Sequence, residues 1–409
     1  MELKKYKLSD VASVEISNVD KKSKVGETVV KLCNFTDVYY SWAVTNEMVN
    51  TFMEATASDK QIERFSLKKG QVALTKDSET RYDIGIPTYI ADDLDNVILG
   101  YHCALITPDE SIVSGKFLNA FINSPYIHKY FENGASGSGQ RYALSIDILE
   151  SMPLLLPSLE EQKRIGDIFS NLDRKIALNR AIYKNLEELA KQIYDYWFLQ
   201  FDFPDKNGRP YKSSGGKMVW NEKLNREIPE GWILTKLSEI CNMYQPQTIG
   251  TDMLIEDGSY RVYGANGVVG QYDKYNHENS EIAMACRGNS CGALNRTMPY
   301  SWITGNAMVI QLKDQDVCNE YIKQALQYMN ISGAITGSGQ PQLTRENLNS
   351  VSCIKPEPHV VNHFSKIIEP LVKLQIKITE ENDDLIRQRD ELLPLLMNGQ
   401  VSIKPNYKE

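Results

Sequence analysis

Gly137-Ser138-Gly139-Gln140 recurs in this chain as Gly337-Ser338-Gly339-Gln340. The residues that follow the two copies also correspond, with one gap, since Leu144-Ser145-Ile146-Asp147 matches Leu343-Thr344-Arg345-Glu346. Further along, Leu149, Ser151 and Pro157 reappear as Leu348, Ser350 and Pro356. An ordered series of matches indicates an internal repeat, and a repeat constrains the architecture before any single motif is interpreted.

The regions before the two tetrapeptides are longer and mostly dissimilar. The first residues of the two regions are nevertheless similar, because Lys7-Leu8-Ser9-Asp10-Val11 resembles Lys236-Leu237-Ser238-Glu239-Ile240. A long helical segment follows each tetrapeptide. Each half of the chain is therefore predicted to consist of a variable domain, a Gly-Ser-Gly-Gln loop and a long helix.

Both long segments carry apolar residues at heptad spacing, which is typical of a coiled-coil seam. In the first segment the apolar seam positions include Ile165, Phe169, Leu172, Ile176, Leu186 and Ile193, with Asn179 among them. In the second segment one heptad position is held by Phe364, Leu371, Ile378, Leu385 and Leu392, and the companion position by Ile367, Leu374 and Leu395.

One apolar stripe is ordinarily explained by a helix that packs on its own domain. Two stripes of about 40 residues, about 60 Å long at 1.5 Å per residue, would leave much of each seam uncovered. They are predicted to cover each other as an antiparallel coiled coil. Asn179 either sets the register of this pair or is exposed near a loop. The second helix begins near residue 357 or, alternatively, at Pro370.

The remaining segments mix short apolar strands with helices, so the predicted fold class is α+β. The runs 71–74, 281–285 and 307–310 are expected to be strands, and 117–121 and 320–329 helices. A stretch rich in Pro and Gly follows the first long helix. The predicted organisation is a first recognition domain at 1–157, a central helix at 158–200, a connector at 201–230, a second recognition domain at 231–356, and a distal helix with the tail at 357–409.

Composition narrows the class of protein. With 42% hydrophobic and 24% charged residues, the 409-residue chain can form several globular cores. A net charge of −8 argues against a protein that coats nucleic acid without specificity. No apolar run is long enough for a membrane span, and the opening residues lack a signal-peptide stretch, so a cytoplasmic protein without membrane attachment is expected. The 7 scattered cysteines are expected to be reduced thiols.

Several strings resemble one family closely, the specificity subunits of Type I restriction-modification systems. The most specific lie in the connector, namely Phe201-Asp202-Phe203-Pro204, Gly208-Arg209-Pro210-Tyr211-Lys212-Ser213-Ser214-Gly215-Gly216 and Ile228-Pro229-Glu230-Gly231-Trp232. Others are Leu156-Pro157-Ser158-Leu159-Glu160-Glu161-Gln162, Tyr263-Gly264-Ala265-Asn266-Gly267 and Arg389-Asp390-Glu391-Leu392-Leu393-Pro394. The resemblance spans nearly the whole chain.

The resemblance implies a non-catalytic subunit whose two target recognition domains each read one half of a split, asymmetric site in double-stranded DNA. The helical spacer would hold the domains apart and dock two methyltransferase subunits, which methylate adenine. With two motor-nuclease restriction subunits, the assembly would instead cut unmodified DNA as a phage defence. The second helix opens with Pro356-Glu357-Pro358-His359 and lacks a Glu-Glu-Gln equivalent, so the two docking surfaces need not be alike.

Base reading requires hydrogen-bonding side chains at groove edges. The candidates in the first domain are Lys76, Ser78, Arg81, Ser138, Gln140, Arg141 and Tyr142, and those in the second are Tyr263, Asn266, Arg287, Asn289, Ser338, Gln340 and Arg345. The two Gly-Ser loops are identical while the half-sites should differ. Phosphate contact or a tight turn is therefore favoured for the loops themselves. Arg287 is the better candidate for a base contact, although a surface turn explains it equally well.

The sequence carries none of the common catalytic motifs. Gly215-Gly216-Lys217 lacks the spacing of a phosphate-binding loop, and the chain contains neither a dinucleotide fingerprint nor the Asn-Pro-Pro-aromatic string of adenine methyltransferases. His359 and His363 have the i, i+4 spacing of a helix but no evident third metal ligand, and Cys286 and Cys291 lack the CxxC spacing of a zinc site. No cofactor or metal is expected. Two rival hypotheses are an interaction scaffold without DNA affinity, which the acidic charge would permit, and an autonomous nuclease.

Overall fold

A computed structural model describes residues 2–138, 141–329, 331–337 and 339–403. The chain forms two compact units: unit 1 comprises Met1–Arg180 and Glu380–Glu409, and unit 2 comprises Ala181–Thr379. Both units contain helices and sheets, which confirms the α+β class. Within the described residues, no helix is both long enough and apolar enough to cross a membrane.

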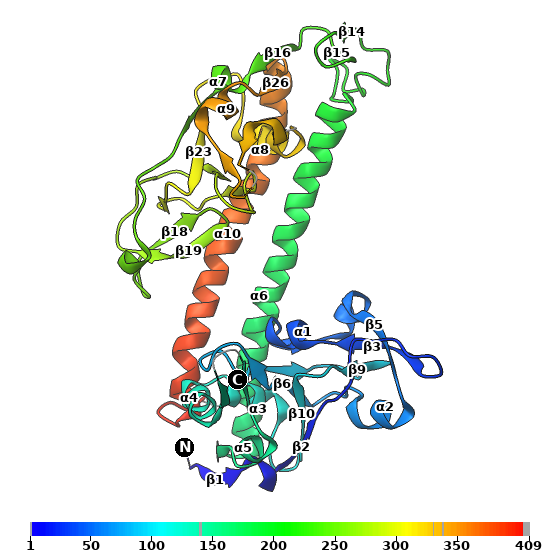
Figure 1. The fold of residues 1–409 in the computed structure, drawn as a ribbon, viewed down its shortest axis with the longest axis vertical. Coiled ribbons are helices and arrows are strands. Elements are labelled where there is room, and N and C mark those ends of the chain that lie inside the picture. The colour runs from blue at the N-terminus through cyan, green and yellow to red at the C-terminus, as the bar shows by residue number, and fades with distance from the viewer. Residues whose placement is uncertain (1, 139–140, 330, 338, 404–409) are drawn as a thin grey trace, which may run out of the picture. The chain divides into compact units, whose positions relative to one another are not determined.

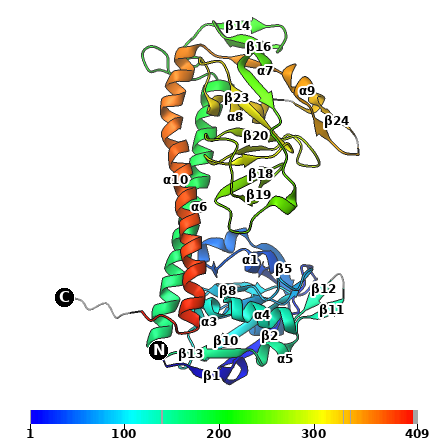
Figure 2. The ribbon, with the colours of Figure 1, turned by 90° about the vertical axis from the view of Figure 1, so that its left-hand side faces the viewer.

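Unit 1 is built on a five-stranded sheet in the order β2-β10-β6-β8-β4. These strands span Ala12–Ile16, Cys103–Pro108, Val72–Thr75, Pro87–Ile90 and Ala43–Val44. A second sheet has the order β5-β3-β9, with bounds Met53–Ala57, Thr28–Cys33 and Val97–Leu99. The central strand β6 is a fully buried apolar run, and α3 (Gly115–Ile122) packs on β6 and β8 (Figure 2). The strand predicted at 71–74 and the helix predicted at 117–121 are thereby confirmed.

Three further helices of unit 1 surround these sheets, namely α1 (Phe35–Tyr39), α2 (Asp59–Phe65) and α4 (Pro125–Gly134). Local capping explains where they begin. Asn34 precedes α1, and its backbone N–H donates to Asp37 Oδ2 at 2.7 Å. This contact satisfies a group that the helix itself leaves unpaired. Pro125 opens α4 at a position where the missing N–H costs nothing.

Unit 2 contains a four-stranded sheet in the order β17-β23-β20-β21, with bounds Cys241–Tyr244, Ala307–Leu312, Ile282–Ala285 and Leu294–Arg296. A smaller sheet, β19-β18-β22, spans Gly267–Tyr272, Tyr260–Gly264 and Trp302–Ile303. The strands predicted at 281–285 and 307–310 are β20 and β23, and the predicted helix is α8 (Asn319–Tyr328). The connector forms a hairpin of β14 (Met218–Asn221) and β15 (Arg226–Pro229).

The internal repeat is visible in the topology of the two units. In unit 1 β10 lies between β2 and β6, and in unit 2 β23 lies between β17 and β20, all antiparallel. The pair β1 (Lys4–Lys7) with β13 (Pro153–Leu156) corresponds to β16 (Ile233–Lys236) with β26 (Ser352–Lys355). The short helices α7 (Leu237–Ile240), α5 (Ile146–Glu150) and α9 (Arg345–Asn349) complete the repeat, and α5 and α9 are capped by Ser145 and Thr344. The matching sequences after the tetrapeptides are therefore matching helix starts.

The two long helices are α6 (Leu159–Tyr194) and α10 (Pro358–Met397), and each contributes residues to both units. In unit 1, Phe169 shares a core with Leu393, and Asn179 Nδ2 donates to Asn382 Oδ1 at 3.0 Å. In unit 2, Gln375 Nε2 donates to the carbonyl of Tyr183. Within unit 1, residue numbers rise along α6 from Phe169 to Asn179 as those of the contacts fall along α10 from Leu393 to Asn382. The helices therefore run antiparallel, as predicted, and they lie side by side (Figures 1 and 2).

The seam on α6 buries Ile165, Phe169 and Ile176 and partly buries Leu172, Leu186 and Ile193. On α10, Phe364 and Ile378 are buried while Leu371, Leu385 and Leu392 are partly buried. The predicted companion position is wrong by one residue, because Ile367, Leu374 and Leu395 are exposed. The inward companions are Ile368, Gln375, Asn382, Arg389 and Leu396, of which all but Ile368 and Leu396 are polar. Heptad spacing of apolar residues cannot reveal seam positions that are occupied by polar residues.

Two alternatives about the helices are resolved. Asn179 is fully buried and also donates to Glu381 Oε2 at 2.9 Å, so exposure near a loop does not explain it. A buried amide with matched partners favours one register over others. The second helix begins at Pro358 and not at Pro370, which lies within α10 on its exposed side. There water can hydrate the carbonyl that Pro370 leaves without a donor.

Asp173 gives the helix pair of unit 1 a testable pH dependence. Burial raises the pKa of Asp173 from 3.8 to about 6, and Arg389 and Arg180 offset this only in part. The folded state thus holds the proton more tightly, so the stability due to this group is complete below about pH 4 and is lost as the pH rises through about 6. Asp173→Asn should be about 1–2 kcal/mol more stabilising at about pH 8 than at about pH 4. Denaturant unfolding at both pH values measures this, and a pH-independent effect would contradict it.

Candidate nucleic-acid interface

The described residues on either side of each tetrapeptide form a short hairpin, made of β11 (Ser136–Ser138) and β12 (Arg141–Ala143) in unit 1 and of β24 (Ile335–Thr336) and β25 (Gln342–Leu343) in unit 2. Figure 2 shows each hairpin at the edge of its unit that faces away from the long helices. Gly137 and Gly337 have φ of +144° and +87°, and a Cβ on either would meet a backbone carbonyl of the same hairpin. The first glycine is therefore required by the turn.

In each unit, a further extended segment pairs with the second strand of the hairpin, and the two segments are at equivalent positions of the repeat. In unit 1, β7 (Asp77–Ser78) pairs with β12, so that Asp77 is opposite Ala143. In unit 2, Arg287 forms a bridge to Gln342. The N–H of Leu144 donates to the carbonyl of Lys76 at 2.8 Å, and Leu343 donates likewise to Cys286 at 3.0 Å. Asp77 and Arg287 thus occupy equivalent positions, two residues after the ends of the core strands β6 and β20.

The segment in unit 1 carries a cluster of charged side chains around a buried carboxylate. Asp77 accepts from Lys76 Nζ at 2.9 Å and from Arg141 Nη2 at 3.2 Å, and it contacts His102 Nδ1. Burial alone would raise the pKa of Asp77, but the hydrogen bonds from Lys76 and His102 hold it below its ordinary value. The carboxylate therefore stays ionised and neutralises part of the surrounding positive charge.

A cavity of about 570 Å³ opens beside this cluster. Its lining includes the aromatic residues Phe35, Tyr39 and Tyr40 together with Asp77, His102 and Arg141. Tyr39 Oη donates to Asp83 Oδ2 at 2.8 Å, which, together with burial, raises the pKa of Tyr39 to about 12. Aromatic faces beside hydrogen-bonding groups are a surface on which nucleic-acid bases pack well.

The comparisons with known proteins identify the family. The family model described as "Type I restriction modification DNA specificity domain" matches residues 2–188 and 229–388. The chain belongs to this family. The two matched segments correspond to the two copies of the repeat, and members of the family are non-catalytic DNA-recognition components of restriction systems.

Two curated specificity subunits align with most of this specificity subunit. One is the Type I restriction enzyme HindI specificity subunit of Haemophilus influenzae, with 24% identity over 82% of this chain and 87% of the relative. The other is the MjaIX specificity subunit of Methanocaldococcus jannaschii, with 21% identity over 86% of this chain and 83% of the relative. The crystal structure of a Type I restriction-modification S subunit from M. genitalium has the same fold, with a TM-score of 0.58, 16% identity, and coverage of 97% and 96% of the two chains.

Most predicted contacts of the first domain come together in the specificity subunit. Arg81 lies over the ring of Tyr142 at 5.1 Å, and Ser78 is opposite Tyr142 in the strand pair. Lys76 and Arg141 form a second group, since both donate to Asp77. The backbone of Ser138 pairs with Arg141, while Gln140 lies outside the described residues. Sequence reasoning missed Tyr39, Asp83 and His102, which belong to no motif and reach the cluster only through the fold.

The predicted contacts of the second domain are less compact. Arg287 and Asn289 are exposed beside the hairpin, Gln340 is exposed within it, and Arg345 begins α9 directly after it. Asn266 is exposed at the separate turn between β18 and β19. Ser338 lies outside the described residues.

Tyr263 is a correction to the predicted set. Its ring is buried, and its Oη accepts the backbone N–H of Met298 at 3.0 Å. Its carbonyl accepts the N–H of Thr304. Tyr263 thus stabilises the small sheet of unit 2, and its buried ring is not available for a contact with DNA. The motif Tyr263-Gly264-Ala265-Asn266-Gly267 forms the turn between β18 and β19.

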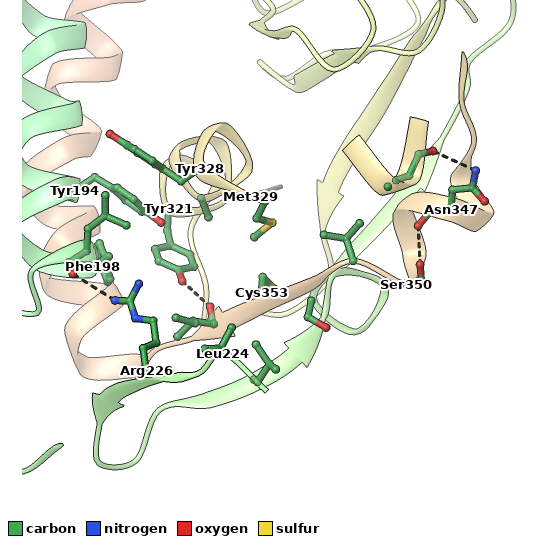
Figure 3. Close-up of a pocket in the computed structure, with 18 residues that line it drawn as sticks. Tyr194, Phe198, Leu224, Arg226, Tyr321, Tyr328, Met329, Asn347, Ser350 and Cys353 are labelled. Atoms are coloured by element: carbon green, nitrogen blue, oxygen red, sulfur yellow. Dashed lines mark hydrogen bonds between the residues drawn. The ribbon is translucent and has the colours of Figure 1, made fainter. Parts of the chain in front are cut away.

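Figure 3 shows a second cavity, of about 520 Å³, that lies within unit 2. Tyr194, Phe198 and Tyr321 form much of its lining, and Arg226 from the connector donates to the carbonyl of Leu199. Tyr321 Oη donates to the carbonyl of Ile354. These contacts join the connector, α6, α8 and β26, so the cavity is part of the packing of unit 2 and we assign it no DNA contact.

Within the described part of the chain, no three His, Cys, Asp or Glu side chains are grouped so as to hold a metal ion. Cys286 is buried, and its Sγ accepts a hydrogen bond from Gln245 Nε2. The ring of His363 packs edge-on against Trp197. All seven cysteines are free. Packing and hydrogen bonding therefore account for Cys286 and His363 in this structure.

Proposed function

We propose that this specificity subunit recognises a bipartite, asymmetric site in double-stranded DNA, with unit 1 reading one half and unit 2 the other. The observation that carries the proposal is the position beside the repeated hairpin, where unit 1 presents Asp77 with Arg141 and unit 2 presents Arg287. Equivalent positions with unlike side chains are what two different half-sites require. We assign the reading of the halves to residues 1–157 and 231–356.

We further propose that α6 and α10 dock two methyltransferase subunits, and that the assembly methylates adenine or, with two motor-nuclease subunits, restricts unmodified DNA. Exposed leucines on the helices support docking there, since Leu178, Leu189 and Leu374 contact solvent although they lie on a coiled-coil pair. The acidic net charge of −8 fits a reader whose partners supply part of the grip on the DNA backbone.

Exchange of residues 1–157 for the matching domain of a relative should change one half of the methylated motif and leave the other half intact. The reason is that each half-site would be read by side chains of one unit alone. Methylome sequencing of hosts that carry the parent or the exchanged gene measures both halves at once. A change in both halves would contradict the domain assignment.

An interaction scaffold without DNA affinity is the competing function, because the chain is acidic. Selection from randomised duplexes in the presence of the methyltransferase partner separates the two. Enrichment of a two-part motif supports recognition of DNA, and no enrichment supports the scaffold.

A further inference from the structure

The cluster around Asp77 holds one arginine in a defined orientation at an exposed surface. The side chain of Arg141 is 58% exposed, whereas that of Asp77 is only 10% exposed. The contacts of Arg141 with Asp77 and His102 use Nη2. The geometry points to Asp77 as a positioning residue for Arg141, and to Arg141 as the residue that reads a guanine in the half-site of unit 1. This inference rests on the proposed function.

Guanine is the base that fits a held guanidinium. Arginine carries five N–H donors in a planar fork and has no acceptor. Asp77 Oδ2 and His102 Nδ1 contact each other, so they lie on the same side of Nη2 and engage one of its two N–H groups. The other N–H of Nη2 forms a two-donor edge with the neighbouring N–H of Nη1 or Nε, and this edge can face a ligand. In the major groove guanine alone offers two neighbouring acceptors, O6 and N7, to such a fork.

A phosphate is a poor fit for the same place. Asp77, Glu79 and Asp83 all line the cavity beside Arg141, and an anionic phosphate would approach three carboxyl groups. A base edge carries no net charge and avoids this repulsion. Phosphates are also alike in both half-sites. The equivalent of Asp77 in unit 2 is Arg287, and the second tetrapeptide is followed by Pro341 in place of Arg141.

The fixed orientation distinguishes a reader from a mobile surface charge. An unanchored arginine on a short hairpin samples many rotamers and pays conformational entropy when it binds. The ionised Asp77 carboxylate, bonded to Lys76 on one oxygen and to Arg141 on the other, removes part of that cost. Asp77→Asn keeps the shape of the side chain but removes its charge.

The test compares base preferences of full-length variants in complex with the methyltransferase partner, using randomised duplexes. Arg141→Lys should lower the preference for guanine at one position of one half-site by about 5- to 150-fold. It should leave affinity for scrambled duplex nearly unchanged, because the positive charge remains. Asp77→Asn should lower the same preference by about tenfold without weakening binding to scrambled duplex. Neither variant should alter the other half-site.

Glu15→Gln is the matched control. Glu15 accepts from Arg64 at 2.7 Å and 2.9 Å, so its replacement breaks another carboxylate–arginine pair of unit 1, away from the hairpin. It should leave every base preference unchanged. If Arg141→Lys preserves the guanine preference, or if either variant weakens binding equally for all sequences, Arg141 is not a base reader. If the parent complex itself selects no two-part motif, the proposed function fails instead. Should Asp77→Asn not fold, Arg141→Lys still decides the question.

Discussion

Phe364→Ala is expected to lower the free energy of unfolding of unit 2 by about 3–5 kcal/mol. Phe364 lies near the start of α10 and is fully buried. Its ring packs edge-on against Phe198 at 5.0 Å and lies 5.8 Å from Trp197 and 6.3 Å from Tyr194. Truncation removes this apolar burial, leaves a cavity among rigid aromatic rings, and weakens the attachment of α10 to the end of α6.

Denaturant unfolding of the full chain, followed by tryptophan fluorescence, measures the loss because Trp197 lies beside the substituted ring. The matched control is Ile367→Ala, one turn further along α10, where the side chain is 37% exposed. Its expected cost is below about 1 kcal/mol. Equal losses in the two variants would mean that Ile367 faces the seam, and the register described for α10 would be wrong.

Leu189→Glu combined with Leu374→Glu is expected to reduce host adenine methylation more than about 100-fold, because two unpaired charges would have to be buried in the proposed methyltransferase interface. Leu189 on α6 is 43% exposed and Leu374 on α10 is 42% exposed. Since both side chains already contact solvent, the fold itself should tolerate the change. Methylome sequencing measures the product, and co-purification with the methyltransferase subunit measures the cause.

Lys184→Glu is the control for the added charge. Lys184 is 76% exposed on α6 and precedes Leu189 by five residues, about 140° around the helix, so a glutamate there should leave methylation near the parent level. Melting temperature should be unchanged in all variants. Normal methylation in the double glutamate variant would contradict docking at these leucines and would leave the recognition of DNA by the two units untouched.

The sequence alone determined the repeat, the α+β class, and the antiparallel pairing of two long helices. These features follow from periodic and local signals. Heptad spacing requires a helix with a buried stripe, and the ordered matches after Gly137 and Gly337 require two similar folds. The capping residues Ser145 and Thr344 form part of that match, which is why the repeat was strongest there.

Only the tertiary structure decided which side chains face inward and which ones meet. Gln375 and Asn382 lie in the seam because partners on α6 satisfy them, and an apolar pattern passes over such positions. Tyr263 is buried because a distant backbone N–H meets its hydroxyl. Asp77, His102 and Arg141 lie up to 64 residues apart in sequence. Asp77 and Arg141 meet because β7 pairs with β12, and His102 joins them because it precedes β10, which pairs with β6. Strand pairing of that kind is set by the packing of the whole unit and not by local sequence.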